Sequence, residues 1–246
     1  GRKLAFGSTT VSKFLNKENL VSQTTNASYI AVMAVGMTAI IILAGIDLSI
    51  GSIYALAALL GAQALNLLGK DASTASMVLV ALLACCGAGA VMGFANGFAS
   101  VALKVHPFVI TLGTMAMYRG IVFVRSGGQT VSLQSENLQK GFFKADFGGV
   151  YPVPTLIMLV VAAAGMFTLS RTVIGRQVYA IGGNESAAKY AGIAVGRVKV
   201  IMYTVLGALA GLSGAMYLGY YGAAENGAGQ AYELRVIAAA VIGGCR

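Results

Sequence analysis

An acidic residue lies between two long apolar stretches of this sequence, in the segment Gly45-Ile-Asp-Leu-Ser-Ile-Gly51. A carboxylate in such a position is costly unless it finds a hydrogen-bonding partner, a cavity or an interface. We favour the interpretation that Asp47 accepts backbone N–H bonds at the start of the following helix. The alternative is that Asp47 and the nearby Ser49 contact a polar solute, because the two glycines permit a break in the helical backbone.

Three more polar residues interrupt later apolar stretches. Asn96, Thr111 and Thr114 carry amide or hydroxyl groups that can hydrogen-bond the hydroxyl groups of a solute. Buried polar side chains of apolar helices more often bond one helix to another, and this is the favoured interpretation for these three. Contact with a solute stays open as the alternative.

Residues 179–193 form a polar segment with signals for a short helix. Asn184 is a suitable N-cap, Glu185 lies in the first turn where a negative charge is favourable, and Gly192 is placed to end the helix. A short helix of this kind is typical of a docking element. The alternative is a plain connector, but two capped turns rich in alanine exceed what a connector requires.

The residue types present argue against several other chemistries. The single histidine, His106, cannot supply the several ligands of a catalytic zinc ion. No glycine-rich loop followed by Lys and Ser or Thr is present to hold nucleotide phosphates. Cys85, Cys86 and Cys245 indicate no disulfide framework. We therefore expect no catalytic residue, no metal and no cofactor bound by this chain.

Long apolar helices must position the polar residues. The chain of 246 residues is 57% hydrophobic and only 10% charged, whereas about a quarter of the residues of an ordinary globular domain are charged. Uncharged stretches longer than the roughly 20 residues that span a bilayer recur along it. The composition therefore predicts an all-α polytopic membrane protein with one transmembrane domain, residues 1–246. The expected spans are residues 27–44, 52–68, 76–103, 107–125, 153–170 and 200–221, with the start of another at 234–246.

Some spans carry further signals. The glycines at 89, 93 and 97, and those at 207 and 211, recur at intervals of four, which predicts helix faces for close packing. Tyr203, Tyr217, Tyr220 and Tyr221 favour an aromatic belt at the membrane surface. The segment 107–125 is shorter and more polar than the other spans. It is expected to be either a tilted span or a re-entrant one.

The formal net charge of +9 is interpreted as topology information, because the basic residues lie between apolar spans. We expect no nucleic-acid partner. The loop 171–199 has five basic residues and one acidic residue, so the positive-inside rule places it in the cytoplasm. Counting back through five membrane crossings from this cytoplasmic loop places Gly1 outside. The basic residues of 1–25 favour the cytoplasmic side instead, so the two signals conflict. An additional upstream helix, or a fourth segment that does not cross, would remove the conflict. The missing initiator Met and the interrupted apolar run 236–245 predict truncation at both ends.

Four groups of residues, in an order that covers nearly the whole chain, carry a family resemblance. They are Ala34-Val-Gly-Met-Thr38 with Gly45-Ile-Asp-Leu-Ser-Ile-Gly-Ser52, Pro107-Phe-Val-Ile-Thr-Leu-Gly-Thr114 with Arg119-Gly120, Gly175-Arg176 with Tyr179 to Ile193, and Tyr232-Glu-Leu234 with Ile237-Ala-Ala239 and Val241-Ile-Gly-Gly244. The set resembles the permease subunits of bacterial ABC importers for ribose, galactose and related monosaccharides. The chain departs from that pattern at Arg235, where an acidic residue is usual, and at its end, where the family continues through further helices.

The resemblance implies a multi-helix importer of the bacterial inner membrane. A periplasmic sugar-binding protein would deliver a ribose-, galactose- or xylose-like sugar to two permease subunits, alike or different. Cytoplasmic ABC ATPase subunits would use ATP and Mg²⁺ to drive transport. Residues 184–191 would be the coupling helix that contacts the ATPase. Its implied site residues are Gly182, Gly183, Asn184, Glu185, Ala187, Ala188 and Gly192. The implied candidates for the permeation pathway are Asp47, Ser49, Asn96, Thr111 and Thr114.

Three alternatives stay open at this point. A branched-chain amino-acid importer belongs to the same broad permease superfamily. A secondary transporter would instead couple transport to an ion gradient through intramembrane charges and discontinuous helices. An inactive membrane fragment would assemble without transporting.

Overall fold

The computed structural model describes residues 16–148 and 151–245, and the chain is almost entirely helical in these parts. The elements in chain order are α1 (Lys17–Ile42), α2 (Ile50–Asn66), α3 (Thr74–Leu103), α4 (Pro107–Ser126), β1 (Val131–Ser132), a π-helix η1 (Gln139–Phe143), α5 (Val153–Arg171), α6 (Val173–Gly183), α7 (Glu185–Tyr190), α8 (Val195–Tyr221), β2 (Ala223–Ala224) and α9 (Tyr232–Ile242). Among the described residues, five helices (α1, α3, α4, α5 and α8) are long and apolar enough to cross a membrane. The prediction of an all-α polytopic membrane protein is therefore confirmed.

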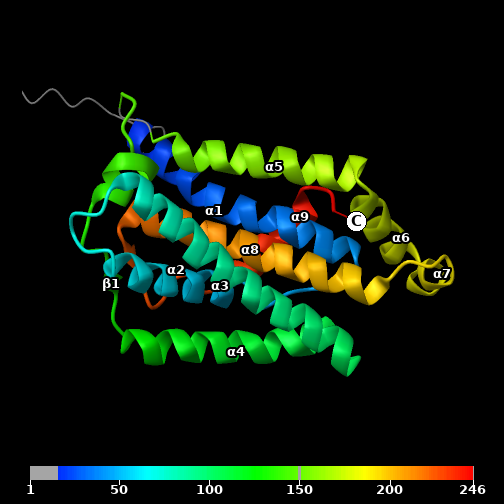
Figure 1. Ribbon diagram of the computed structural model, residues 1–246. Helices are drawn as coiled ribbons and strands as arrows, with labels where there is room; N and C mark the ends of the chain where they lie inside the picture. Colours follow the sequence, from blue (N-terminus) through cyan, green and yellow to red (C-terminus); the bar gives the residue numbers. More distant parts are fainter. Residues whose placement is uncertain (1–15, 149–150, 246) are drawn as a thin grey trace, which may run out of the picture.

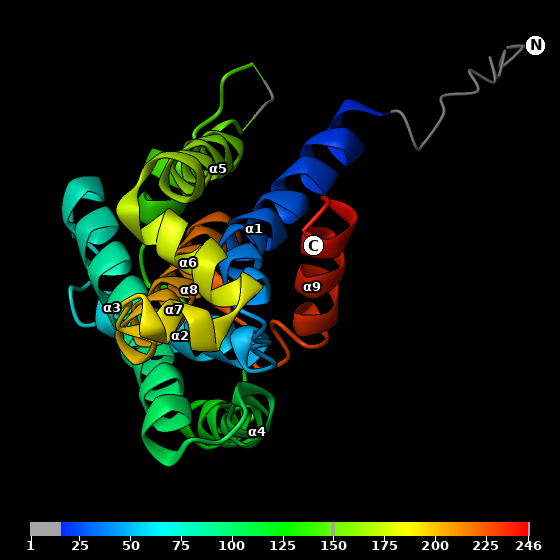
Figure 2. The same cartoon turned by 90° about the vertical axis from the view of Figure 1, so that its right-hand side faces the viewer.

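The long helices lie side by side in a bundle with two distinct ends. Figure 1 shows α6 and α7 at one end, which we call the α7 end, and the β1 strand at the other, which we call the opposite end. In the view along the bundle, α8 lies inside a ring formed by the other long helices (Figure 2). Its main packing partners are α3, α2 and α1. At the opposite end β1 pairs antiparallel with β2, with Val131 opposite Ala224.

Local signals explain where several helices begin and end. Helix α3 begins after Ser73, whose hydroxyl oxygen accepts a hydrogen bond from the Ser76 N–H at 3.2 Å. Helix α4 has a proline at its first position, where the missing N–H costs nothing, and its N-cap His106 accepts a bond from the Phe108 N–H. Helix α8 ends at Gly222, which has a φ of 72° that glycine adopts readily.

Glycines bring α3 and α8 into backbone contact. A Cβ atom added to Gly89 would meet the carbonyl oxygen of Gly207, and one added to Gly211 would meet that of Cys85. A Cβ on Gly97 would lie 2.9 Å from the Cβ of Tyr203. The predicted glycine faces are confirmed as close-packing surfaces, in which small residues let two helix backbones approach.

Several helix boundaries differ from the sequence-based expectation. Helix α1 begins at Lys17 rather than at residue 27, because polar residues continue the helix beyond its apolar part. Helix α8 likewise begins at Val195 rather than at 200. The range 171–199, expected to be a loop with one short helix at 184–191, contains α6 in addition to the expected helix, α7. Hydropathy marks only the apolar part of a helix, so polar extensions and short amphipathic helices were not delimited by it.

The fourth segment is one continuous helix. Helix α4 has 20 residues and lies along the bundle beside the other long helices (Figure 1). Its length and composition suit a membrane crossing. The structure therefore favours a span over the re-entrant alternative for this segment. The basic residues at positions 2, 3 and 13 lie outside the described residues.

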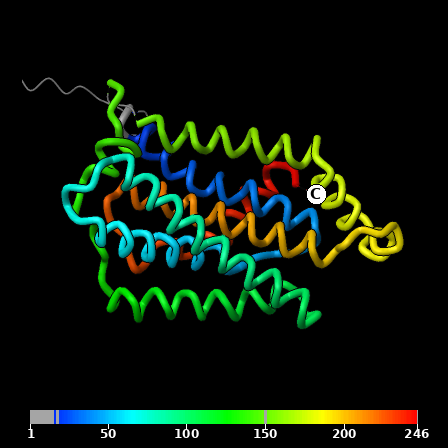
Figure 3. Tube along the Cα trace, in the orientation of Figure 1, coloured from blue at the N-terminus to red at the C-terminus, as the bar shows by residue number. Residues whose placement is uncertain are grey.

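Two non-helical segments interrupt the bundle, and they meet. The first, residues 43–49, runs back along the bundle from the end of α1 before α2 begins (Figure 3). The second, residues 222–231, joins α8 to α9 and includes Gly229, with a φ of 71°. A Cβ atom on Gly51 would meet the carbonyl oxygen of Gly229, and a Cβ on Gly229 would meet that of Gly51. Irregular backbone at membrane depth is tolerated where protein buries it or where it lines a cavity.

Candidate functional site

A buried hydrogen-bond network holds the first non-helical segment. The Asp47 Oδ1 accepts bonds from the Ser49 N–H at 2.8 Å and from the Ser49 hydroxyl at 2.6 Å. The Asn96 Nδ2 of α3 donates to the Ser49 Oγ at 2.7 Å and to the Asp47 Oδ2 at 3.4 Å. Asp47 thus accepts a backbone hydrogen bond from Ser49, the N-cap residue of α2. This is close to the expected role, in which Asp47 accepts backbone N–H bonds at the start of that helix. Its acceptors are satisfied by neutral donors.

Thr111 of α4 satisfies backbone groups of the same segment. Its hydroxyl oxygen accepts a bond from the Leu48 N–H at 3.2 Å and lies 3.4 Å from the carbonyl oxygen of Ile46. Tyr203 of α8 also reaches the Ile46 carbonyl oxygen, at 3.4 Å. Helices α4 and α8 therefore supply hydroxyl groups to backbone atoms of Ile46 and Leu48, which lie between the two helices α1 and α2.

The five candidate pathway residues are not equivalent in the structure. Four of them lie close together and have no exposed surface: Asp47, Ser49, Asn96 and Thr111 each have a relative exposure of 0%. Thr114 is partly exposed, and its hydroxyl donates to the carbonyl oxygen of Thr111 within its own helix. The geometry of the buried four suits the bonding of helices to one another.

At the α7 end, the short helix α7 has the predicted caps. The Asn184 side chain accepts a bond from the Ala187 N–H at 2.9 Å. Glu185 lies 2.8 Å from the Nζ of Lys189 and 2.8 Å from the Nζ of Lys199, so it joins α7 to α8. Gly192 has a φ of 83° directly after the helix. Gly182 and Gly183, which the resemblance assigned to the coupling helix, instead end α6.

The exposed face of α7 differs from the one expected. Ala188 is buried, with only 4% of its surface exposed, because it points toward the bundle. Tyr190 is 93% exposed, and Ser186 and Ala187 are exposed beside it. Sequence reasoning missed Tyr190, which lies at the end of the short helix.

The α7 end carries most of the positive charge of the described helix connections. A cavity of about 630 Å³ lies between the α3–α4 connection and α7, lined by Lys104, His106, Glu185, Lys189 and Lys199 among others. The connections at the opposite end have no excess of basic residues, since they set Lys70, Lys140 and Lys144 against Asp71, Glu136, Asp146 and Glu225. The distribution agrees with the prediction that the α7 end faces the cytoplasm.

The ion pairs of Glu185 lower the pKa of its carboxyl group. The hydrogen bond from Lys189 contributes most, and the bond from Lys199 adds to it. A carboxylate bonded to ammonium groups is favoured in its charged form. Glu185 is 41% exposed on its side chain, so solvent screens both pairs.

Helix α4 also supports the second non-helical segment. The Arg119 guanidinium donates to the carbonyl oxygen of Ala228 at 2.7 Å. The tyrosines at the end of α8 surround the same segment from the other side. Tyr217 and Tyr220, like Tyr203 nearer the start of α8, are buried with 8% or less of their surface exposed, so the predicted aromatic belt at the membrane surface is wrong for these three, whereas Tyr221 is 42% exposed. Tyrosine hydroxyls bond to backbone and side-chain groups inside a bundle as readily as at a headgroup layer.

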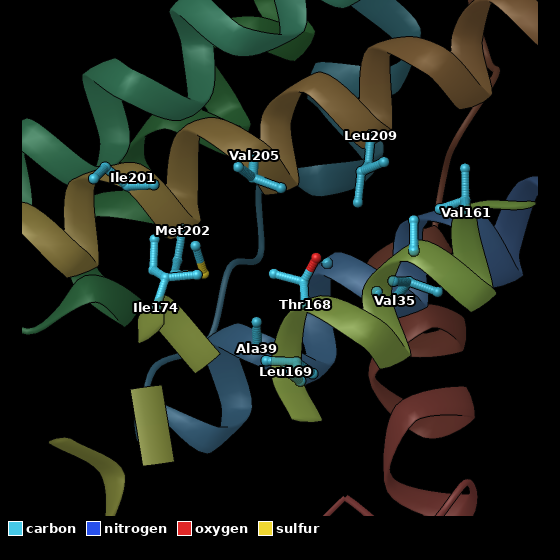
Figure 4. A pocket seen from close by; sticks show the side chains of 13 residues that line it. Val35, Ala39, Val161, Thr168, Leu169, Ile174, Ile201, Met202, Val205 and Leu209 are labelled. Carbon is cyan, nitrogen blue, oxygen red and sulfur yellow. The ribbon is translucent and has the colours of Figure 1, made fainter. Parts of the chain in front are cut away.

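An apolar groove lies between α1, α5, α6 and α8. It has a volume of about 340 Å³ and is lined by residues such as Val35, Val161 and Leu209. Figure 4 shows that Thr168 brings the single hydroxyl group seen among these side chains. The groove therefore does not suit a polyhydroxylated solute. Among the described residues, no group of three His, Cys, Asp or Glu side chains lies close enough to hold a metal ion.

The helices and their two breaks define a polytopic membrane protein of the transport type, with discontinuous helices that meet inside the bundle. The chain belongs to the family of permease components of branched-chain amino acid transport systems, whose profile matches residues 19–246. It is thus a multi-pass protein of the inner membrane. No solved structure gave a significant match.

Curated relatives match over nearly the whole chain. The ribose import permease protein RbsC of Escherichia coli (strain K12) is 37% identical over 243 residues, which cover 98% of this chain and 74% of that protein. The D-allose transport system permease protein AlsC of the same strain is 37% identical over 239 residues, 97% of this chain and 71% of that protein. The autoinducer 2 import system permease protein LsrC of Klebsiella pneumoniae is 33% identical over 219 residues, 89% of this chain and 61% of that protein.

Proposed function

We propose that this chain is the permease subunit of an ATP-driven importer that moves a monosaccharide across the inner membrane. The observation that carries the proposal is the 37% identity to a ribose import permease over 98% of the chain. The relatives reported above are named for ribose, D-allose and autoinducer 2, so the branched-chain amino-acid alternative is not favoured.

The importer would be completed by separate chains. A cytoplasmic ABC ATPase would bind ATP and Mg²⁺, and this chain would bind neither. A periplasmic binding protein would deliver the sugar, and a second permease subunit would complete the pathway. The chain itself would be a transport subunit without catalytic residues.

The α7 helix is the proposed contact for the ATPase. It projects from the bundle at the end with excess positive charge, and it presents Tyr190, Ala187 and Ser186 to the surroundings. Asn184 and Glu185 fix its start and join it to α8. Because Lys199 belongs to α8, a displacement of α7 would act directly on the central helix of the bundle.

The buried network around Asp47 has a proposed supporting role. Asp47, Ser49, Asn96 and Thr111 would hold the 43–49 segment in one conformation, so that the adjacent pathway keeps its shape. Thr114 is the member of the candidate set with exposed surface that a solute could contact.

Co-purification of the partners tests the proposal. The chain is tagged on its chromosome, extracted in a mild detergent and analysed by mass spectrometry. An ATPase and a soluble sugar-binding protein should co-purify. Recovery of the intact chain alone, under conditions that keep other importers assembled, would instead favour an ion-coupled transporter or an inactive fragment.

Two tyrosine variants localise the ATPase contact. Tyr190→Ala on α7 should abolish recovery of the ATPase, because it removes the most exposed aromatic ring of the proposed contact. Tyr179→Ala is the matched control, since Tyr179 is 54% exposed on the neighbouring α6. Equal ATPase recovery with both variants would refute the α7 assignment. Ala188→Arg is unsuitable as a test, because a charge at this buried position would disturb α7 itself.

A further inference from the structure

A polar, aromatic cavity lies at the second non-helical segment. Its volume is about 320 Å³, and its lining includes Tyr54, Tyr217, Tyr221 and Tyr232. Small-molecule sites have volumes of roughly 300–1,000 Å³, so the cavity suits a compact solute. It is distinct from the buried network around Asp47 and from the cavity at the α7 end.

The tyrosine rings form a continuous wall. The Tyr54 ring lies 5.7 Å from the Tyr217 ring and 5.3 Å from the Tyr232 ring, measured between centroids. The Tyr217 and Tyr221 rings lie 4.8 Å apart. Such rings offer apolar surface to the C–H groups of a sugar ring and hydroxyl groups at their edges.

One hydroxyl group of this wall has no partner. Tyr54 is fully buried, and its hydroxyl oxygen has no hydrogen-bond partner among the residues that the structure describes. A buried polar group without a partner is costly, and a bound ligand that supplies one removes the cost. Tyr29 has a partnerless buried hydroxyl as well, but it is not among the residues that line this cavity.

The rim of the cavity carries both charges and neutral polar groups. Glu225, Gln230 and Arg235 are exposed and line it, and the Tyr221 hydroxyl donates to the Asn26 side chain at 2.9 Å. The carboxylate and the guanidinium offset each other, so the site does not require a charged ligand. Their mixture of donors and acceptors suits a neutral ring with several hydroxyl groups.

We infer that this cavity is a solute site within the permease, which binds a neutral cyclic polyol such as a monosaccharide and gives the Tyr54 hydroxyl its partner. This inference rests on the proposed import function. It also gives Arg235, which is exposed near the start of α9, a place at the rim of a polar cavity.

The site includes the point where the two breaks meet. Gly229 lines the cavity, and a Cβ atom on it would lie 2.8 Å from the Tyr54 ring. The Tyr54 ring therefore packs closely against Gly229, beside the contact between Gly51 and Gly229. A shift of one break relative to the other would move the Tyr54 hydroxyl and change the shape of the site.

A pair of matched variants tests the site. The purified chain is placed in lipid nanodiscs, and binding of D-ribose, D-allose and D-galactose is measured by saturation-transfer NMR, which detects weak binding. Tyr54→Phe removes only the hydroxyl and should weaken binding of the best of these sugars about three- to tenfold, the effect of one neutral hydrogen bond. Tyr29→Phe removes the other partnerless hydroxyl and should leave binding unchanged. Both variants should melt at or above the temperature of the wild type, because each removes a buried group without a partner.

ATP-dependent uptake by the complete importer separates failure of the site from failure of the function. If the wild-type importer takes up one of these sugars while Tyr54→Phe binds it as tightly as Tyr29→Phe does, the site is refuted and the proposed function stands. If the wild-type importer takes up none of them, the proposed function fails for these sugars and the inferred site fails with it.

Discussion

Gly51, in the first turn of α2, packs backbone to backbone against Gly229, in the segment between α8 and α9. Each glycine lacks the Cβ atom that would meet the carbonyl oxygen of the other. The contact joins two interruptions of the helical bundle that lie far apart in the sequence. It also places Tyr54, one turn along α2, against the second interruption.

Replacement of Gly229 should destabilise the protein. Gly229→Ala places a Cβ atom against Gly51 and the Tyr54 ring, in a backbone conformation with φ near 71° that costs a non-glycine residue roughly 1–2 kcal/mol. The total loss should exceed about 2 kcal/mol, or roughly 4 °C in melting temperature. Gly227→Ala, in the same segment but with open space around it, is the control and should change stability by less than about 0.5 kcal/mol. Similar melting temperatures for the two variants would show that the contact is unimportant.

The α3–α8 contact gives a second matched pair. Gly89→Ala places a methyl group against the carbonyl oxygen of Gly207, and such overpacking costs typically about 1–3 kcal/mol. Gly87→Ala, on the same helix, meets open space and should be neutral or stabilise by up to about 1 kcal/mol through helix propensity. Thermal unfolding in detergent, followed by circular dichroism, measures both. A Gly89→Ala variant as stable as Gly87→Ala would contradict the close approach of the two backbones.

The network around Asp47 predicts different results for two substitutions. Asp47→Asn keeps an oxygen that accepts the Ser49 N–H and should stay folded, with a melting temperature near that of the wild type. Asp47→Ala leaves the Ser49 N–H and the Asn96 amide without this partner, at a cost of about 1–3 kcal/mol. Asp47→Glu should lower protein yield more than it changes substrate preference. Normal yield with altered preference would instead indicate direct contact with the solute.

The ion pairs of Glu185 predict a pH dependence of α7. The pairs with Lys189 and Lys199 lower the pKa of this carboxyl group in the folded state, so their stabilisation is complete above the ordinary pKa of glutamate, about 4.3. The stabilisation is lost as the pH falls through the lowered pKa, because protonation then removes the charge. Hydrogen exchange of the α7 amides, corrected for intrinsic rates, should be faster in Glu185→Gln than in the wild type at pH 7, and the difference should be smaller at pH 3. An equal difference at both values would exclude the ion pairs as its cause.

Much of the fold could be predicted from the sequence because bilayer spans have a strong compositional signal. The apolar runs located α3 and α5 to within a few residues at each end. Asn184 and Gly192 located α7, since both act through local backbone geometry. Helix α6 was missed because Val173–Gly183, with 11 residues, is too short for a span.

The candidate sites were harder to predict, since they depend on contacts between distant residues. The sequence marked Asp47 and Asn96 as polar residues in apolar surroundings, but it could not show that they bond to each other. The role of Gly229 depends on Gly51, which only the fold brings near it. The tyrosines of α8 were assigned to the membrane surface by a rule that considers position along a helix and ignores the neighbouring helices.

Sugar uptake by the complete importer in proteoliposomes is the most direct test of the proposed import function. The wild-type chain is reconstituted with the ATPase and binding protein that co-purify with it, and uptake of labelled D-ribose is followed with and without ATP on the ATPase side. We expect uptake that requires ATP and Mg²⁺ and persists when ionophores collapse all ion gradients. Uptake that proceeds without ATP and stops on addition of an ionophore would contradict the proposed function and identify an ion-coupled transporter.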